Sequence, residues 1–159
     1  MTDSPVVNAS PLIVLSRAGR LDLLHHFSAR VVVPVAVAAE VAAHSDEAAR
    51  ALASEAWLQQ VPGGPVPDAI SAWDLGAGES AVLAWALAHP GTVAVLDDYA
   101  ARECAEVLGV PVRGTLGLVL AAKARGHVVA ARPVIEELQR AGLYLSAGLV
   151  ERVLSLVDE

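Results

Sequence analysis

Short valine-rich runs recur along the chain, and stretches long enough to form helices separate them. The runs lie at residues 6–7, 31–33, 92–98 and 110–112. Such short, continuously apolar runs are typical of parallel strands that are buried on both faces of a sheet. Parallel strands need long crossover connections, which helices usually supply. The alternation therefore predicts an α/β fold with a central, mostly parallel sheet and helices on both faces.

A single domain over residues 1–159 accommodates this pattern. Segment 61–73 is rich in Pro and Gly, so we expect a surface loop there that is too short to divide two domains. Ser10 and Pro11 are typical of a helix start, as N-cap and first-turn residue. The helices expected between and after the strands cover about residues 11–17, 21–27, 34–43, 46–56, 76–88, 99–108, 116–125, 133–140 and 147–157.

The charge of the chain limits the way in which it could bind a polyanion. Its formal net charge is −7, whereas nucleic-acid-binding modules are usually basic. All of its basic residues except Lys123 are arginines. Phosphate contacts would therefore have to come from local arginines such as Arg17, Arg102 or Arg113, or from a metal ion that acidic residues hold.

The cysteine content and the hydropathy pattern predict a cytoplasmic protein. Cys104 is the only cysteine, which excludes an internal disulfide and a thiolate metal site. No apolar run reaches the roughly 18 residues that a membrane-spanning helix needs. The first residues also lack the basic start of a secretory signal. We therefore expect no membrane partner.

Polar residues follow two of the predicted strands, and two further acids lie in apolar helices. Asn8 follows the first strand, and Asp97 and Asp98 end the third. Glu40 lies in "PVAVAAEVAA", and Glu79 follows "GAG" at a helix start. A carboxylate beside apolar residues needs a partner, and no Lys or Arg lies within one helical turn of Glu40 or Glu79. A shared divalent cation would satisfy these oxygens, and Mg²⁺ or Mn²⁺ prefers such ligands.

Each of these residues also has an ordinary structural interpretation. Glu79 is favoured at a helix start by the helix dipole, and Asp98 could cap a helix or pair with Arg102. Glu40 could lie on a solvated face, and Asn8 could form a turn hydrogen bond. These alternatives explain the residues one at a time but leave their combination unexplained.

The order of these motifs resembles that of PIN-domain proteins. The resemblance is closest to VapC-like toxins of bacterial toxin–antitoxin pairs, in the group known as DUF3368. It covers nearly the whole chain except residues 46–73, and the combination of "NASPL" with "GTLG" makes it fairly specific. The matching stretches are "VVNASPLIVLSRAGRLDLL", "VVVPVAVAAEV", "LGAGESAVLAWALA", "VAVLDDYAARECAEVLGVPVRGTLGLVLAAKARG" and "PVIEELQRAGLYLSAGLVERVL".

This resemblance implies a three-layer α/β/α sandwich with an acidic metal pocket that cleaves RNA with Mg²⁺ or Mn²⁺. It also implies an antitoxin protein as partner, whereas a homodimer is expected from the apolar C-terminal helices considered below. The four acidic positions of the pocket fall on Asn8, Glu40, Glu79 and Asp98, with Asp97 as a secondary ligand. Ser10 matches the small hydroxyl residue near the first acid. Substrate contacts are expected from Ser10, Arg102 and Thr115.

Asn8 departs from the acidic pattern, because its amide oxygen can bind a metal ion but carries no charge. We expect weaker metal affinity and slower turnover rather than automatic loss of activity. The alternative is a catalytically weak or inactive PIN-like module that binds RNA or an antitoxin. A receiver-like phosphoacceptor domain, suggested by the paired aspartates with Thr115 and Lys123, has its acids in the wrong order along the chain.

The paired histidines and the C-terminal helices each have a structural as well as a functional interpretation. His25 and His26 could suggest a metal pair, but adjacent helical residues face different sides, which favours a solvated helix end. The helices at about 133–157 carry many aliphatic residues. We expect these residues to form an interface with a second copy or an antitoxin, or alternatively to pack on their own sheet.

Overall fold

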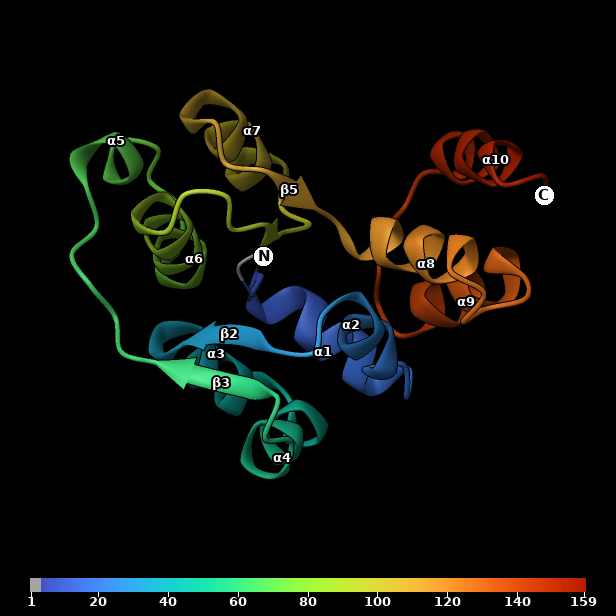
Figure 1. Cartoon of the computed structure of the whole chain (residues 1–159), viewed down its shortest axis with the longest axis horizontal. Helices are drawn as coiled ribbons and strands as arrows, with labels where there is room; N and C mark the ends of the chain where they lie inside the picture. Colours follow the sequence, from blue (N-terminus) through green and yellow to red (C-terminus); the bar gives the residue numbers. More distant parts are fainter. Residues whose placement is uncertain (1–3) are drawn as a thin grey trace.

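A computed structural model describes residues 4–159 of the chain. Within these residues five parallel strands form one sheet, in the order β3-β2-β1-β4-β5. This arrangement confirms the predicted three-layer α/β/α fold (Figure 1). The strands are β1 (Val6–Val7), β2 (Val31–Pro34), β3 (Leu58–Val61), β4 (Ala94–Val95) and β5 (Val112–Arg113).

Helices connect the strands and cover the sheet. In Figure 1, α6 and α7 lie on the left of the sheet, and α2, α8 and α9 lie on its right. No helix in the described part of the chain is both long and apolar enough to cross a membrane. The helices are α1 (Ala9–Arg17), α2 (Asp22–Phe27), α3 (Val35–His44), α4 (Asp46–Ser54), α5 (Asp68–Ser71), α6 (Ala77–Ala88), α7 (Tyr99–Leu108), α8 (Thr115–Ala124), α9 (Ala131–Arg140) and α10 (Ala147–Leu156).

The structure corrects several of the expected boundaries. Strand β4 covers only Ala94–Val95 of the expected 92–98, β5 lies at Val112–Arg113 rather than at 110–112, and α9 begins at Ala131 rather than at residue 133. The helix expected to reach residue 56 ends at Ser54, and edge strand β3 follows it with two exposed glutamines in its centre. A one-turn helix, α5, lies inside the expected loop. Helix α1 begins at Ala9, so Ser10 lies within its first turn and Asn8, rather than Ser10, occupies the N-cap position. Pro11 still fits there because the first-turn N–H groups have no intrahelical partner.

The chain order of the strands reverses at β1. Strand β1 pairs with β2 on one side and with β4 on the other, and its Val7 lies opposite Val95. Residues of all three strands are fully buried or nearly so, as the continuous valine runs predict. In open parallel sheets, ligands bind beyond the carboxyl ends of the strands at such a reversal point. Asn8 directly follows β1 at this point.

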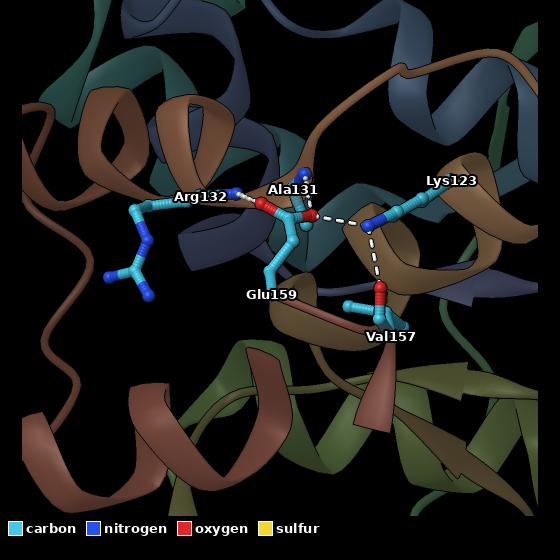
Figure 2. A network of polar contacts seen from close by, with 5 residues as sticks. All are labelled: Lys123, Ala131, Arg132, Val157 and Glu159. Carbon is cyan, nitrogen blue, oxygen red and sulfur yellow. Dashed lines mark hydrogen bonds and ion pairs between the residues drawn. The ribbon is translucent and has the colours of Figure 1, made fainter. Parts of the chain in front are cut away.

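A carboxylate near the end of the chain fastens the last two helices to α8 (Figure 2). Glu159 accepts hydrogen bonds from the backbone N–H groups of Ala131 (2.6 Å) and Arg132 (3.0 Å), which are the first residues of α9. Lys123 of α8 donates to Glu159 (2.6 Å) and to the Val157 carbonyl (2.7 Å). The carboxylate thus caps α9, whose own N-cap residue provides no side-chain bond.

These contacts predict a stability effect at acid pH. The hydrogen bond from Lys123, followed by those from the two backbone N–H groups, lowers the pKa of Glu159 from 4.5 to about 2. A lowered carboxyl pKa contributes stability that is complete above the unfolded pKa and is lost as the pH falls through the folded pKa. We therefore expect the wild type to have a higher melting temperature than Glu159→Gln at neutral pH. The difference should shrink between about pH 5 and pH 2.

Melting curves of the two proteins across this pH range measure the effect. Glu136→Gln is a suitable control. Glu136 is an exposed acid of α9, the helix that Glu159 caps, and it makes no side-chain hydrogen bond among residues 4–159. A difference between wild type and Glu159→Gln that does not change with pH would contradict this role for the carboxylate.

Candidate functional site

The side chain of Asn8 is buried at the point where the strand order reverses. Only 2% of the residue is exposed, and its backbone N–H donates to the Val95 carbonyl at 3.1 Å. The amide oxygen Oδ1 is also buried and accepts no hydrogen bond from the described residues, so the turn bond considered for Asn8 is not formed. An unsatisfied buried acceptor costs about 1–3 kcal/mol. A buried oxygen of this kind is suited to a ligand that the protein itself does not provide.

Glu40 brings a carboxylate to the same place from α3. Gly78, in the first turn of α6, marks the meeting point: a Cβ atom on Gly78 would lie 2.6 Å from Glu40 Oε2 and 3.1 Å from Asn8 Oδ1. Glycine therefore leaves the space that both oxygens use. Glu40 is exposed and forms no ion pair with a described residue. The structure thus brings together two of the four sequence-predicted positions, one directly after β1 and one on α3.

The side chains of Glu79 and Asp98 are directed toward the starts of their own helices. Glu79 Oε2 lies 2.6 Å from the position of a Cβ atom on Gly76, the N-cap residue of α6. Asp98 is the N-cap of α7 and accepts from the Ala101 N–H at 2.9 Å. The helix-start interpretation of both residues therefore holds in this conformation. Across residues 4–159, no three His, Cys or acidic side chains form a group that could hold a metal ion.

Comparison with family models assigns the sequence of the chain to a known family. A family model described as a PIN domain, DUF3368, matches residues 4–159. The chain belongs to the PIN-domain family. A search of the curated proteins finds none that matches it. PIN domains are in general nucleases, typically dependent on divalent metals, so a nuclease-like function follows for this chain in general terms.

Asp97 of this PIN domain is bonded to the start of α8 rather than to the Asn8–Glu40 pair. The backbone N–H of Thr115 donates to Asp97 Oδ1 (2.8 Å), and the Thr115 hydroxyl donates to Asp97 Oδ2 (2.5 Å). Thr115 is fully buried. Asp97 therefore caps α8 from the end of β4. These bonds favour a structural role for both residues over the expected roles of secondary metal ligand and RNA contact.

The other residues expected to contact RNA lie on the surface of the PIN domain. Ser10 is exposed, two residues beyond Asn8. Arg102 is also exposed, and its Nη1 lies 2.6 Å from the position of a Cβ atom on Gly114. Its considered ion pair with Asp98 is not formed in the described structure. Arg17 donates to the carbonyl of His44 at 3.3 Å.

The paired histidines of α2 are both exposed, and each stacks on another ring. His25 stacks on Trp57 with ring centroids 4.3 Å apart, whereas His26 stacks on His127 at 4.0 Å. The two imidazoles therefore pack against different partners.

Sequence reasoning missed Gly78 and Gly114, each of which leaves room for a functional side chain. The available signals were the "GAG" and "GTLG" motifs. Both motifs were used to recognise the family, but neither glycine was assigned a role. Each position needs glycine because a side chain from another element approaches it closely, and the sequence alone does not show this contact.

The contact between Asp97 and Thr115 predicts a stability effect without a metal effect. Thr115→Val removes the hydroxyl donor and leaves one oxygen of Asp97 without its partner, which should lower the free energy of unfolding by about 1–3 kcal/mol. Thr115→Ser, which keeps the hydroxyl, should cost less. Urea denaturation measures the stability, and calorimetric titration with Mn²⁺ measures the binding. Loss of Mn²⁺ binding in a folded Thr115→Val protein would contradict the structural role.

Proposed function

We propose that this PIN domain is a metal-dependent endoribonuclease and the toxin of a type II toxin–antitoxin pair. The observation that carries the proposal is the unpartnered, buried oxygen of Asn8, which lies beside the Glu40 carboxylate where the strand order reverses. The carboxyl edge of a parallel sheet is also the usual place for a ligand. The antitoxin belongs to the proposal through the resemblance to VapC-like toxins. The homodimer belongs to it through the apolar C-terminal helices, and the cytoplasmic location through the cysteine content and hydropathy of the sequence.

The donor set fits a hard divalent cation. Asn8 and Glu40 provide an amide oxygen and a carboxylate around the space over Gly78, and Glu79 directly follows Gly78 in the chain. Mg²⁺ and Mn²⁺ prefer such oxygen ligands. Asn8, Glu40, Glu79 and Asp98 would hold the ion, and the last two would first have to leave their helix-start positions. When bound, the ion would lower the pKa of a water molecule and neutralise charge on the scissile phosphate.

The residues of the chain would position the reactants around that ion. The buried amide of Asn8 would hold its oxygen in a fixed position as a ligand, because β1 and α1 fix the backbone on either side of it. The exposed Glu40 carboxylate can accept a proton from the attacking water. The water oxygen would bond to phosphorus while the bond to the 3′ oxygen breaks, and the leaving 3′ oxygen would take up a proton from solvent. This hydrolysis would leave a 5′-phosphate and a 3′-hydroxyl.

A second candidate is a PIN-like module that binds RNA or an antitoxin and cleaves slowly or not at all. Two observations favour it. Asn8 is neutral where the family pattern has an acid, and Asp98 is occupied as the N-cap of α7. Both would weaken metal binding, since one missing carboxylate removes a large part of the attraction for a divalent ion.

The C-terminal helices provide less free apolar surface than the sequence suggests. Leu138, Leu143 and Leu154 are buried within the chain itself. Leu156 remains exposed on α10, as does Tyr144 in the preceding connection. Packing within the chain therefore accounts for much of this surface, and the proposed homodimer rests on what remains exposed, such as Leu156 and Tyr144. Sedimentation of the purified protein at micromolar concentration would show whether it dimerises.

A combined metal-binding and RNA-cleavage experiment tests the proposed function. The purified protein is titrated with Mn²⁺ and Mg²⁺ by calorimetry and then incubated with a panel of total RNA, with either ion or with EDTA. The nuclease proposal requires metal binding and cleavage that EDTA abolishes. Metal binding and cleavage that are both absent at high protein concentration, with RNA binding retained, would establish the binding module instead.

A further inference from the structure

A groove of about 410 Å³ opens beside Asp97, beyond the carboxyl ends of β4 and β5. One wall comes from α8, and the other from α10 and the connection that precedes it. Figure 1 shows β5 leading into α8, with α10 beyond it. Aliphatic side chains, such as Leu116, Leu120, Leu149 and Val153, line much of the groove. Asp97 follows β4 and Asn8 follows the neighbouring strand β1, so the groove and the candidate metal site lie at the same edge of the sheet.

Two arginines line the groove, and contacts with neighbouring residues hold their side chains in place. The Arg102 guanidinium lies over Gly114, with Nη1 2.6 Å from the position that a Cβ atom would take. The Arg113 side chain lies against Gly117 in the same way, and its guanidinium is 5.4 Å from the centre of the Phe27 ring. Both arginines are exposed, and neither forms an ion pair within residues 4–159.

The charges at the groove favour a polyanion. Asp97 is the one acidic residue among those that line it, and both of its oxygens accept hydrogen bonds from Thr115. Tyr144 lines the groove with 92% of its surface exposed. Cationic side chains along a groove, together with an exposed aromatic ring, are the pattern by which proteins bind single-stranded nucleic acid. The local positive charge thus opposes the net charge of −7 of the whole chain.

We propose that this groove binds the RNA strand next to the cleavage site. Arg102 and Arg113 bind phosphates, Tyr144 stacks on a base, and the aliphatic wall contacts sugar and base faces. The proposal rests on the proposed function in that it takes RNA as the substrate. A peptide segment with acidic and aliphatic residues is the competing occupant, because the same two arginines and aliphatic wall would suit it.

Fluorescence anisotropy of a short, labelled single-stranded RNA in the presence of EDTA tests the groove separately from cleavage. We expect Arg102→Ala and Arg113→Ala each to weaken binding and to reduce the salt dependence, the slope of log K against log salt, by about 0.7. Tyr144→Ala should weaken binding about tenfold. Arg50→Ala is the control for net charge, since Arg50 is an exposed residue of α4, outside the groove, and should not change the slope by this amount.

Gly114→Ala provides a sharper test, because it changes no charge. Its methyl group would meet the Arg102 guanidinium and Asp97, so the guanidinium has to move. The backbone at Gly114 (φ −89°, ψ 171°) is one that alanine adopts readily. We expect weaker RNA binding in a folded protein, in the same direction as Arg102→Ala. Gly148→Ala is the matched control, because a Cβ atom there meets nothing within 4 Å.

The outcomes separate the groove from the nuclease function. RNA binding that depends on Arg102, Arg113 and Gly114 supports the groove even if no cleavage is found. RNA affinities of these variants equal to those of their controls overturn it, even if the protein cleaves RNA. Binding of a labelled acidic, leucine-containing peptide that depends on both arginines, with no binding of RNA, also overturns it in favour of a protein partner.

Discussion

Glu40→Gln is expected to lower the affinity for Mn²⁺ by at least about 100-fold, because a charge a few ångströms from a divalent ion contributes several kcal/mol even at high effective dielectric. Metal-dependent RNA cleavage should fall by a similar factor. The Glu40 carboxylate shares the space over Gly78 with the unpartnered oxygen of Asn8. Calorimetric titration with Mn²⁺ and cleavage rates at saturating RNA measure the two effects.

The matched control for this substitution is Glu106→Gln. Glu106 is an exposed glutamate on α7, and the same loss of charge there should leave Mn²⁺ affinity and cleavage close to those of the wild type. The fold of Glu40→Gln should also be intact, since the side chain is exposed and forms no hydrogen bond with the described residues. A folded Glu40→Gln protein that binds Mn²⁺ like the wild type would remove Glu40 from the metal site.

Asn8→Asp is expected to change stability and metal affinity in opposite ways. Without metal, the new carboxylate is buried beside Glu40 with no partner, so the melting temperature should fall. With Mn²⁺, the added charge should raise the affinity about tenfold or more, and bound ion should restore the melting temperature. Cleavage should increase if the neutral amide limits the wild-type enzyme. Melting curves in EDTA and in Mn²⁺, followed by the cleavage assay, measure these effects.

Asn8→Leu is the companion variant, because it keeps a side chain of similar size but removes the amide oxygen. It should lose Mn²⁺ affinity while remaining folded, since the oxygen that it removes has no protein partner among residues 4–159. The Mn²⁺ affinity of the wild type should therefore lie between those of the two variants. An Asn8→Asp protein that gains no melting temperature from Mn²⁺ would show that position 8 does not contact the ion.

The fold could be predicted largely from local pattern. The valine runs that become β1, β2 and β4 are buried on both faces. Continuous apolar runs of this kind are typical of strands in the interior of a parallel sheet. Strand β3 was missed because its sequence, Leu-Gln-Gln-Val, pairs on one side only and leaves its glutamines exposed. An edge strand needs no continuous apolar run, so its composition gave no strand signal.

The candidate site could be predicted only in part. The family resemblance indicated Asn8 and Glu40, and their oxygens do meet over Gly78. Asp97 was considered as a metal ligand, but it caps the helix that begins at Thr115, 18 residues further along the chain. Local sequence does not reveal a bond of this kind, because it depends on the pairing of β4 with β5. The sequence likewise does not reveal the cap that Glu159 provides for α9, because that cap depends on how the residues after α10 pack against α8 and α9.

A crystal soaked in Mn²⁺ would test most directly whether the four positions share one metal ion. Anomalous scattering locates the ion without any assumption about its ligands. We predict one strong peak over Gly78, with the oxygens of Asn8 and Glu40 in its coordination shell and with Glu79 and Asp98 turned toward it from their helix-start positions. No peak in this space, or a peak elsewhere with Asn8 Oδ1 still unpartnered, would contradict the proposed metal centre.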